Sequence, residues 1–186
     1  LFGGSFDPVH LGHLLVAQAA REELGLTRLF FVPAFQSPFK PERQPTPAGE
    51  RLRLLRLALA GWEWCAIDEQ EIRRGGISYT IDTVRHYVER RPRAELFYLI
   101  GADQAGQLSK WRAAEELAQL VEFVVIPRPG QGVSTLPPSF RGRELTGFPV
   151  AISSSQIRAR VKARQTLEPL VPPQVAEAIR NNGLYL

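Results

Sequence analysis

The sequence predicts an α/β fold built on a parallel β-sheet that helices cover on both faces. Short apolar runs alternate along the chain with segments whose apolar residues recur at spacings of three and four, as strands and amphipathic helices do. The runs are almost continuously apolar, which is typical of strands buried on both faces of a parallel sheet. The 186 residues suffice for one domain with a sizeable core, and no repeat or interdomain linker is visible.

The first half of the chain contains three expected strands and three expected helices. Strands are expected at residues 1–2, 29–32 and 64–67. Helices are expected over residues 14–24, around 52–59 and around 81–88. Residues 33–47 contain five prolines and are expected to form a long loop, a candidate for function.

The second half continues the alternation. Strands are expected at residues 96–100, 123–126 and 150–152, with a loop rich in Pro, Gly and Ser over 127–142. Helices are expected around 114–121, from 153 to about 164, and over 175–182. The chain opens on Leu1-Phe2 without methionine, which predicts that the native polypeptide has a few more apolar residues upstream.

Ligands of such sheets bind beyond the carboxyl ends of the strands, near the point where the strand order reverses. In this sequence the rule selects residues 3–13, 33–40, 101–103 and 152–158. The motifs with chemical character fall in these segments.

Residues 3–13 read Gly-Gly-Ser-Phe-Asp-Pro-Val-His-Leu-Gly-His and match neither a P-loop nor the Gly-x-Gly-x-x-Gly pattern. The two glycines permit a tight turn and close approach of a ligand to the backbone. His10 and His13 stand three apart at the start of the expected helix, where their N–H groups and the helix amides suit a phosphate. Zinc binding is the alternative, with Asp7 as the one nearby third ligand.

Residues 152–158 read Ile-Ser-Ser-Ser-Gln-Ile-Arg. Serines at a helix start leave backbone N–H groups free, and Arg158 lies about one turn into the helix on the same side. One serine is explained as a plain N-cap. Three serines followed by an arginine favour a phosphate site.

The chain carries a modest excess of positive charge. It has 23 Lys and Arg against 19 Asp and Glu, a formal net charge of +4 and a pI of about 9.6. This balance suits a nucleoside triphosphate and equally a solvated surface. Aromatic residues are not interleaved with the basic ones as a base-stacking surface requires, so no nucleic-acid partner is expected.

No apolar run approaches the roughly 20 residues of a membrane span, so no membrane partner is expected, and no signal peptide is visible. Cys65 is the single cysteine, which excludes an intramolecular disulfide and a cysteine metal cluster. A cytoplasmic setting is therefore expected. The oligomeric state stays open, a homo-oligomer included.

The two phosphate motifs together resemble the nucleotidyltransferase superfamily with the His-x-Gly-His signature. Within it, the chain is similar to bacterial nicotinate-nucleotide adenylyltransferases over essentially its whole length, including Leu-Val-Pro at 170–172 and Asn-Gly-Leu-Tyr at 182–185. Three further segments favour this member: Ser-Tyr-Thr-Ile-Asp-Thr at 78–83, Ile-Gly-Ala-Asp at 100–103 and Lys-Trp at 110–111.

This resemblance implies a Rossmann-like doubly wound sheet in a single domain over residues 1–186, with a small C-terminal helical part. It implies transfer of AMP from ATP to nicotinate mononucleotide, giving nicotinate adenine dinucleotide and pyrophosphate in NAD biosynthesis. Mg²⁺ is expected to arrive on the ATP phosphates, and no protein metal ligand is assigned.

The resemblance also implies which residues form the site, each named at the position of this sequence that matches the family's motifs. The expected catalytic residues are His10, His13 and Arg158. The residues expected to bind ATP lie in the phosphate motifs and after the central strand: Gly3, Gly4, Ser5, Phe6, His13, Gly101, Asp103, Ser154, Ser155 and Arg158. The residues expected to bind the acceptor are Lys40, Thr80, Trp111 and Arg112. For Trp111 the alternative is core packing, for Asp103 a helix N-cap and for Arg112 a solvent-facing side chain.

Two positions depart from the family's pattern. The family usually carries Pro-His-Lys or Pro-His-Arg in the second loop, whereas this chain has Phe39 before Lys40, so no histidine role is carried over. A tyrosine usually follows the tryptophan, and this chain has Arg112.

Two other functions remain as alternatives. A sister adenylyltransferase acting on nicotinamide mononucleotide or phosphopantetheine would share the phosphate motifs. A non-catalytic nucleotide- or nucleic-acid-binding module would fit the basic pI, but intact His10, His13 and Arg158 disfavour it.

Overall fold

A parallel sheet forms the centre of the molecule, as expected. The computed structural model describes residues 1–39, 44–130, 135–148 and 150–186. Within them six strands pair in the order β3-β2-β1-β4-β5-β6, and all neighbours are parallel. The strands are β1 (Phe2–Gly4), β2 (Leu29–Pro33), β3 (Cys65–Ile67), β4 (Phe97–Gly101), β5 (Glu122–Ile126) and β6 (Gly142–Glu144).

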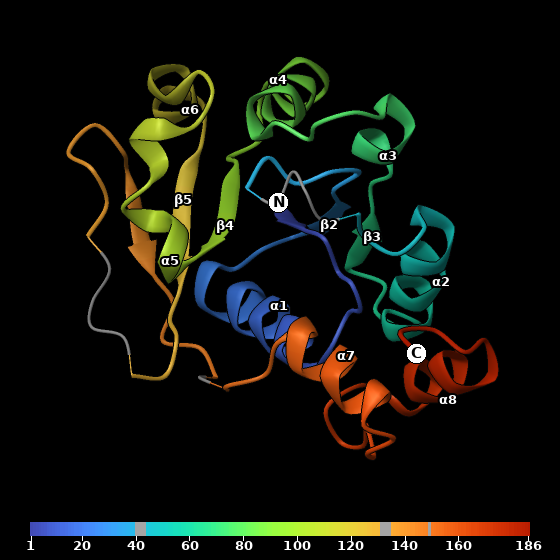
Figure 1. The fold of residues 1–186 in the computed structure, drawn as a ribbon. Helices are drawn as coiled ribbons and strands as arrows, with labels where there is room; N and C mark the ends of the chain where they lie inside the picture. Colours follow the sequence, from blue (N-terminus) through green and yellow to red (C-terminus); the bar gives the residue numbers. More distant parts are fainter. Residues whose placement is uncertain (40–43, 131–134, 149) are drawn as a thin grey trace.

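Helices cover both faces of this sheet (Figure 1). One face packs against α1 (Leu11–Leu24), α2 (Ala48–Ala58), α7 (Ser154–Lys162) and α8 (Pro173–Asn181). The other face packs against α4 (Thr80–Arg90) and α6 (Ala114–Leu120). Shorter helical turns connect these elements: α3 (Gln70–Arg74), α5 (Ala102–Ala105) and the 3₁₀ turn η1 (Leu108–Lys110).

Alternating side chains of the central strands divide the core in two. On β4, Leu99 belongs to the core under α1, whereas Tyr98 and Ile100 belong to the core under α4 and α6. Because successive strand residues point to opposite faces, both halves of each apolar run are buried. This explains why the strands read as continuous hydrophobic runs, and it makes the fold a doubly wound α/β sheet.

The strand order reverses between β1 and β4. From β1 the chain moves outward to β2 and β3, then returns to the other side of β1 and moves outward through β4, β5 and β6. Phe2 pairs with Leu99 across the reversal. The crevice beyond the carboxyl ends of β1 and β4 is therefore the expected place for a ligand.

The prediction of a strand at residues 150–152 is wrong. The sixth strand is β6, which pairs with β5 at the edge of the sheet, and residues 150–153 have no regular structure. The sequence of β6, Gly-Arg-Glu, is exposed and gives no apolar signal. Val150 and Ile152 are apolar for another reason: they line a cavity.

The other differences are at element ends and in short helices. β1 continues through Gly4, β2 includes Pro33, and α7 ends at Lys162 rather than near Arg164. The turns α3, α5 and η1 span at most five residues, too few to show a helical period. Among the described helices, none has both the length and the apolar character needed to cross a membrane.

Candidate active site

Two adjoining cavities open at the carboxyl ends of β1 and β4. The first has a volume of about 350 Å³ and is lined by residues of the β1–α1 loop, the α7 start and the segment around Gly147. The second has a volume of about 180 Å³ and lies toward α4 and Trp111. Both are lined by Phe2, Ser5, Ser37 and Gly101, so the two cavities are neighbours.

The two motif histidines meet at the first cavity. His10 is the N-cap residue of α1, and His13 lies in its first turn. Their rings stack with centroids 3.7 Å apart and an interplanar angle of 25°, and both line the cavity. His10 is buried, and its Nδ1, which lies against Gly12, has no hydrogen-bond partner in the described part of the chain.

A backbone hydrogen bond sets the tautomer of His13. The backbone N–H of His10 donates to Nδ1 of His13 at 3.1 Å. An accepting ring nitrogen carries no proton, so the neutral His13 ring holds its proton on Nε2. Burial lowers the pKa of His10 to about 4 and holds the pKa of His13 well below its usual value, with His10 adding to the second effect. Both rings are therefore neutral at pH 7, and His13 is an N–H donor.

Close packing holds this pair in place. The Phe6 ring lies edge-on to His13 with centroids 5.0 Å apart, and Phe6 adopts a positive φ of 45°, which L-residues rarely do. A Cβ on Gly12 would lie 3.1 Å from Nδ1 and Cε1 of His10, tighter than ordinary contacts. Glycine between the two histidines therefore lets the His10 ring lie against the helix start.

The start of α7 faces the same cavity. Ser153 caps the helix by accepting from the backbone N–H of Gln156. The other two serine hydroxyls make contacts within the protein: Ser154 Oγ donates to the Pro8 carbonyl at 2.9 Å, and Oγ of the exposed Ser155 accepts from Arg158 at 2.9 Å.

Arg158 connects the two phosphate motifs. Besides its contact with Ser155, its guanidinium donates to the Asp7 carbonyl at 2.6 Å, and the side chain lines the first cavity. The segments at 3–13 and 152–158, far apart in sequence, are thus joined at one wall of the cavity, and the positive end of the α7 dipole makes this wall a candidate for binding an anion.

The expected glycines lie where no side chain fits. A Cβ on Gly3 would collide with Tyr98 Oη, and one on Gly4 would lie 3.1 Å from Phe6 Cζ. Gly101 lines both cavities.

Asp103 does not line either cavity. It lies in the first turn of α5 and pairs with Arg128 at 3.2 Å. Arg128 itself lines the first cavity, a cation that the sequence analysis missed.

The second cavity is lined by two of the residues expected for the acceptor. Trp111 and Thr80 are both at its wall, Thr80 as the first residue of α4, and Thr80 Oγ1 donates to the buried Tyr98 Oη at 3.2 Å. The indole N–H of Trp111 is buried and has no partner among the described residues. Phe39 lies against Trp111 with ring centroids 5.8 Å apart. Lys40 lies outside the described residues.

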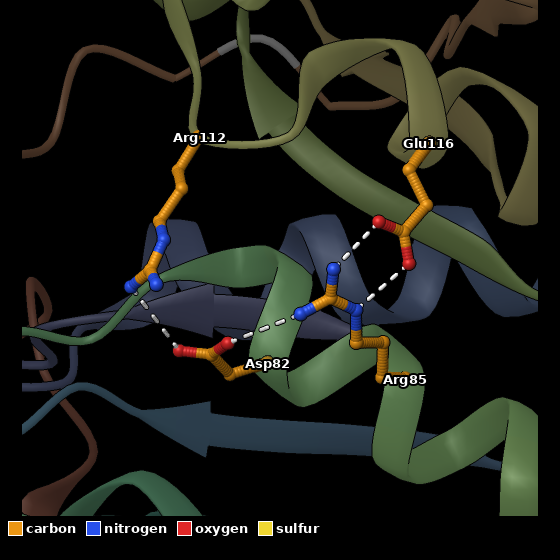
Figure 2. Close-up of polar contacts among 4 residues, drawn as sticks. All are labelled: Asp82, Arg85, Arg112 and Glu116. Atoms are coloured by element: carbon orange, nitrogen blue, oxygen red, sulfur yellow. Dashed lines mark hydrogen bonds and ion pairs between the residues drawn. The ribbon is translucent and has the colours of Figure 1, made fainter.

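Arg112 is not brought into the cavity. Its guanidinium lies 4.0 Å from Asp82 and 4.7 Å from the centre of the Tyr79 ring. Figure 2 shows it reaching toward Asp82, which also faces Arg85, while Arg85 pairs with Glu116. These side chains are well exposed, so the contacts hold the segment after Trp111 on α4 only weakly.

The sequence analysis also missed Arg51, which holds the loops around the site. Its side chain is 1% exposed, and it donates to the backbone carbonyls of Ser5, Ala34 and Thr46 at 2.8–2.9 Å. One signal in the sequence could have revealed it. Arg51 stands three and four residues before Leu54 and Leu55, so it interrupts the apolar face of α2 with a charge.

No group of three or more His, Cys, Asp or Glu side chains gathers as metal ligands in the part of the chain that the structure describes. The rings of His10 and His13 are stacked on each other.

Comparison with known proteins shows the family of this chain. The sequence model of the cytidylyltransferase-like family matches residues 1–160. A protein of Opitutus terrae named "Probable nicotinate-nucleotide adenylyltransferase" is 43% identical over 185 residues, covering 98% of this chain and 95% of the relative. A protein of Geobacillus kaustophilus with the same name is 42% identical, covering 100% and 84%.

Solved structures support the fold. The nicotinic acid mononucleotide adenylyltransferase of Plasmodium falciparum, complexed with NaAD, superposes with a TM-score of 0.80 at 17% identity, covering 99% of this chain and 95% of that chain. The sequence likeness to the two bacterial relatives covers 98% and 100% of this chain. The chain therefore belongs to the nicotinate-nucleotide adenylyltransferase family.

Proposed function

We propose that this protein transfers AMP from ATP to nicotinate mononucleotide, forming nicotinate adenine dinucleotide and releasing pyrophosphate. The observation that carries the proposal is the pair of adjoining cavities at the strand-order reversal. One cavity has an anion-binding wall suited to a triphosphate, and the other has a tryptophan and a helix start suited to a pyridine ring with a carboxylate.

The reaction needs positioning more than proton transfer. A 5′-phosphate oxygen of the acceptor attacks the α-phosphorus of ATP in line, the new P–O bond forms, and the bond to pyrophosphate breaks. Because the acceptor phosphate is already an anion at neutral pH, no strong general base is required. Catalysis then rests on stabilising charge as it develops on the α-phosphate and the leaving group.

We assign His10 and His13 to the phosphates at the reacting centre. The neutral His13 ring donates from Nε2 without placing a full positive charge in the cavity. Arg158 and the backbone amides at Ser154 and Ser155 hold the β- and γ-phosphates, which leave as pyrophosphate. The backbone from Gly3 to Phe6 and Gly101 line the junction of the two cavities, and we assign them to the α-phosphate of ATP. Asp103 would bond ribose hydroxyls at the edge of this site.

We assign Trp111 and Thr80 to the acceptor. The indole face suits the pyridinium ring, whose positive charge favours an aromatic face. The start of α4 has no side-chain cap, so its backbone N–H groups and the Thr80 hydroxyl can bind the ring carboxylate. Lys40 is proposed for the acceptor by resemblance. For Arg112 the contact with Asp82 leaves at most a longer-range electrostatic role.

Mg²⁺ is proposed to enter as part of the MgATP substrate, held by its phosphates. The described residues provide no cluster of carboxylates that would hold it independently. We also propose a cytoplasmic location, where ATP is available and a single unpaired cysteine is stable.

Pyrophosphate release with ATP and each acceptor in turn tests the proposal. At neutral pH we expect nicotinate mononucleotide to be preferred over nicotinamide mononucleotide by at least about tenfold in kcat/KM, because the amide leaves a buried donor unpaired, at a cost of ~1–3 kcal/mol. Phosphopantetheine should not react. Equal kcat/KM values for the two mononucleotides, or a preference for the amide, would assign the chain to a sister reaction.

A further inference from the structure

Glu71 places a buried carboxyl group in the wall of the second cavity. Its side chain lies on α3, is 4% exposed and belongs to the cavity lining. Among the described residues that line this cavity it is the one carboxylic acid, and none of them is a lysine or arginine.

Two hydroxyl groups hold this carboxyl in position. Thr83 Oγ1, fully buried on α4, donates to Glu71 Oε1 at 2.5 Å. The Ser78 hydroxyl also bonds to Glu71, and its Oγ accepts from the backbone N–H of Phe35 at 2.9 Å. Glu71 is therefore connected to α4 through Thr83 and to the loop after β2 through Ser78, and residues of both segments line the cavity.

The cavity is small, so any charge on the acceptor ring lies close to Glu71. A compartment of about 180 Å³ is only about 7 Å across if it is compact. Two carboxylates at such separations disfavour double ionisation, and one of them binds a proton. A ring amide has no negative charge and suffers no such conflict.

We propose that Glu71 takes up a proton from solvent when an acceptor with a ring carboxylate enters the second cavity, and that this protonation governs the choice between acid and amide. The neutral carboxyl tolerates the acid, and the ionised carboxylate repels it. This inference rests on the proposed acceptor site.

The surroundings of Glu71 are consistent with this proton uptake. Burial raises the pKa of Glu71, and Asp68 adds to that effect, whereas the bonds from Thr83 and Ser78 and the positive charge of Arg74 act against it. From β4, the buried Tyr98 is neutral, since burial and Glu71 both raise its pKa. From α4, the Tyr87 hydroxyl donates to Asp68 at 2.7 Å.

The test is the ratio of kcat/KM for nicotinate mononucleotide to that for nicotinamide mononucleotide, measured between pH 5.5 and 9. Titration of the 5′-phosphate is shared by both acceptors and cancels in the ratio. In the wild type the ratio should fall as pH rises and Glu71 ionises, by up to about tenfold per pH unit. In Glu71→Gln, which keeps an oxygen acceptor for Thr83, the ratio should be independent of pH. Glu69→Gln, on a neighbouring residue outside the cavity, should behave like the wild type.

A second measurement needs no variant. Calorimetry in two buffers of different ionisation enthalpy, with a non-reactive ATP analogue present, counts protons bound with each acceptor. The acid should take up more protons than the amide, by up to one. Equal proton counts, or the same pH dependence of the ratio in wild type and Glu71→Gln, would overturn the inference while leaving the transferase activity in place. A wild type that uses neither acceptor would overturn the proposed function itself.

Discussion

His13 illustrates how neighbours decide the chemical state of one residue. The backbone N–H of His10 occupies Nδ1, and burial keeps the ring neutral, so what remains is a single N–H donor on Nε2. A neutral donor stabilises charge that develops in the transition state without binding the ground-state triphosphate as tightly as a full cation would.

Replacing His13 tests this role. His13→Ala should lower kcat by roughly 10²–10³, the usual effect of losing one donor to developing charge. His86→Ala, which removes the histidine on α4 far from the cavities, is the matched control and should leave kcat unchanged. Circular dichroism checks that both variants fold. A folded His13→Ala enzyme with wild-type turnover would contradict the assignment.

Arg158 should act on one substrate only. Arg158→Ala removes the guanidinium from the wall of the first cavity, so the Kd for ATP should rise by about tenfold or more, as for the loss of a charged hydrogen bond, while the Kd for the mononucleotide changes little. Lys162→Ala removes an equal charge from the exposed end of the same helix and controls for long-range electrostatics. Calorimetry with each ligand decides: equal losses for the two ligands would exclude Arg158 from the triphosphate.

At the scale of elements, the starts of α1 and α7 form the wall that we propose binds the triphosphate, and α2 holds the loops around it. Arg51 is the connection, since its hydrogen bonds go to Ser5 in the β1–α1 loop and to Ala34 and Thr46 in the segment between β2 and α2. Backbone carbonyls buried without a donor are costly, and one guanidinium satisfies all three.

Arg51→Met should therefore destabilise the protein. The three carbonyls lose their donor, and the free energy of unfolding should fall by roughly 2–4 kcal/mol. Arg53→Met, on the exposed side of the same helix, should change it by less than about 0.5 kcal/mol. Urea unfolding of both variants measures the difference. A stability loss in Arg53→Met as large as in Arg51→Met would show that helix composition, not the carbonyl contacts, is responsible.

The elements also show what sequence could predict. Strands that are buried on both faces can be predicted from the sequence because they are apolar runs. The phosphate motifs at residues 3–13 and 152–158 can also be recognised, because each is a continuous stretch of sequence. β6 was missed because an edge strand with the sequence Gly-Arg-Glu buries nothing. The direction of Arg112 depends on Asp82, thirty residues earlier, and the burial of Glu71 depends on Thr83 and Ser78. Such contacts are set by tertiary packing, which one-dimensional patterns do not contain.

For the whole molecule, the buried histidines couple stability to pH. His10 has a pKa of about 4 in the folded protein, below the 6.5 of an unfolded chain. Between these values the unfolded state binds more protons, so stability is complete above pH 6.5 and declines as pH falls toward 4. His13 acts in the same direction.

The expected loss can be measured. Between pH 7 and pH 5, His10 alone should lower the free energy of unfolding by about 2 kcal/mol. In His10→Gln that share of the loss should disappear, while carboxylates elsewhere contribute equally to both proteins. Urea unfolding at the two pH values measures the loss of unfolding free energy in each protein, and the difference between the two losses is the contribution of His10. The same loss in wild type and His10→Gln would mean that His10 titrates alike in both states.

The wall that the two cavities share has a consequence for inhibition. Because Phe2, Ser5, Ser37 and Gly101 border both compartments, a molecule that fills one ends next to the other. Two weak fragments, one for each compartment, would bind as a linked pair at an effective concentration in the millimolar range or above for a short tether. Such a bisubstrate compound would exclude both substrates at once. A tether too short for both fragments to occupy their compartments together would remove the gain in affinity.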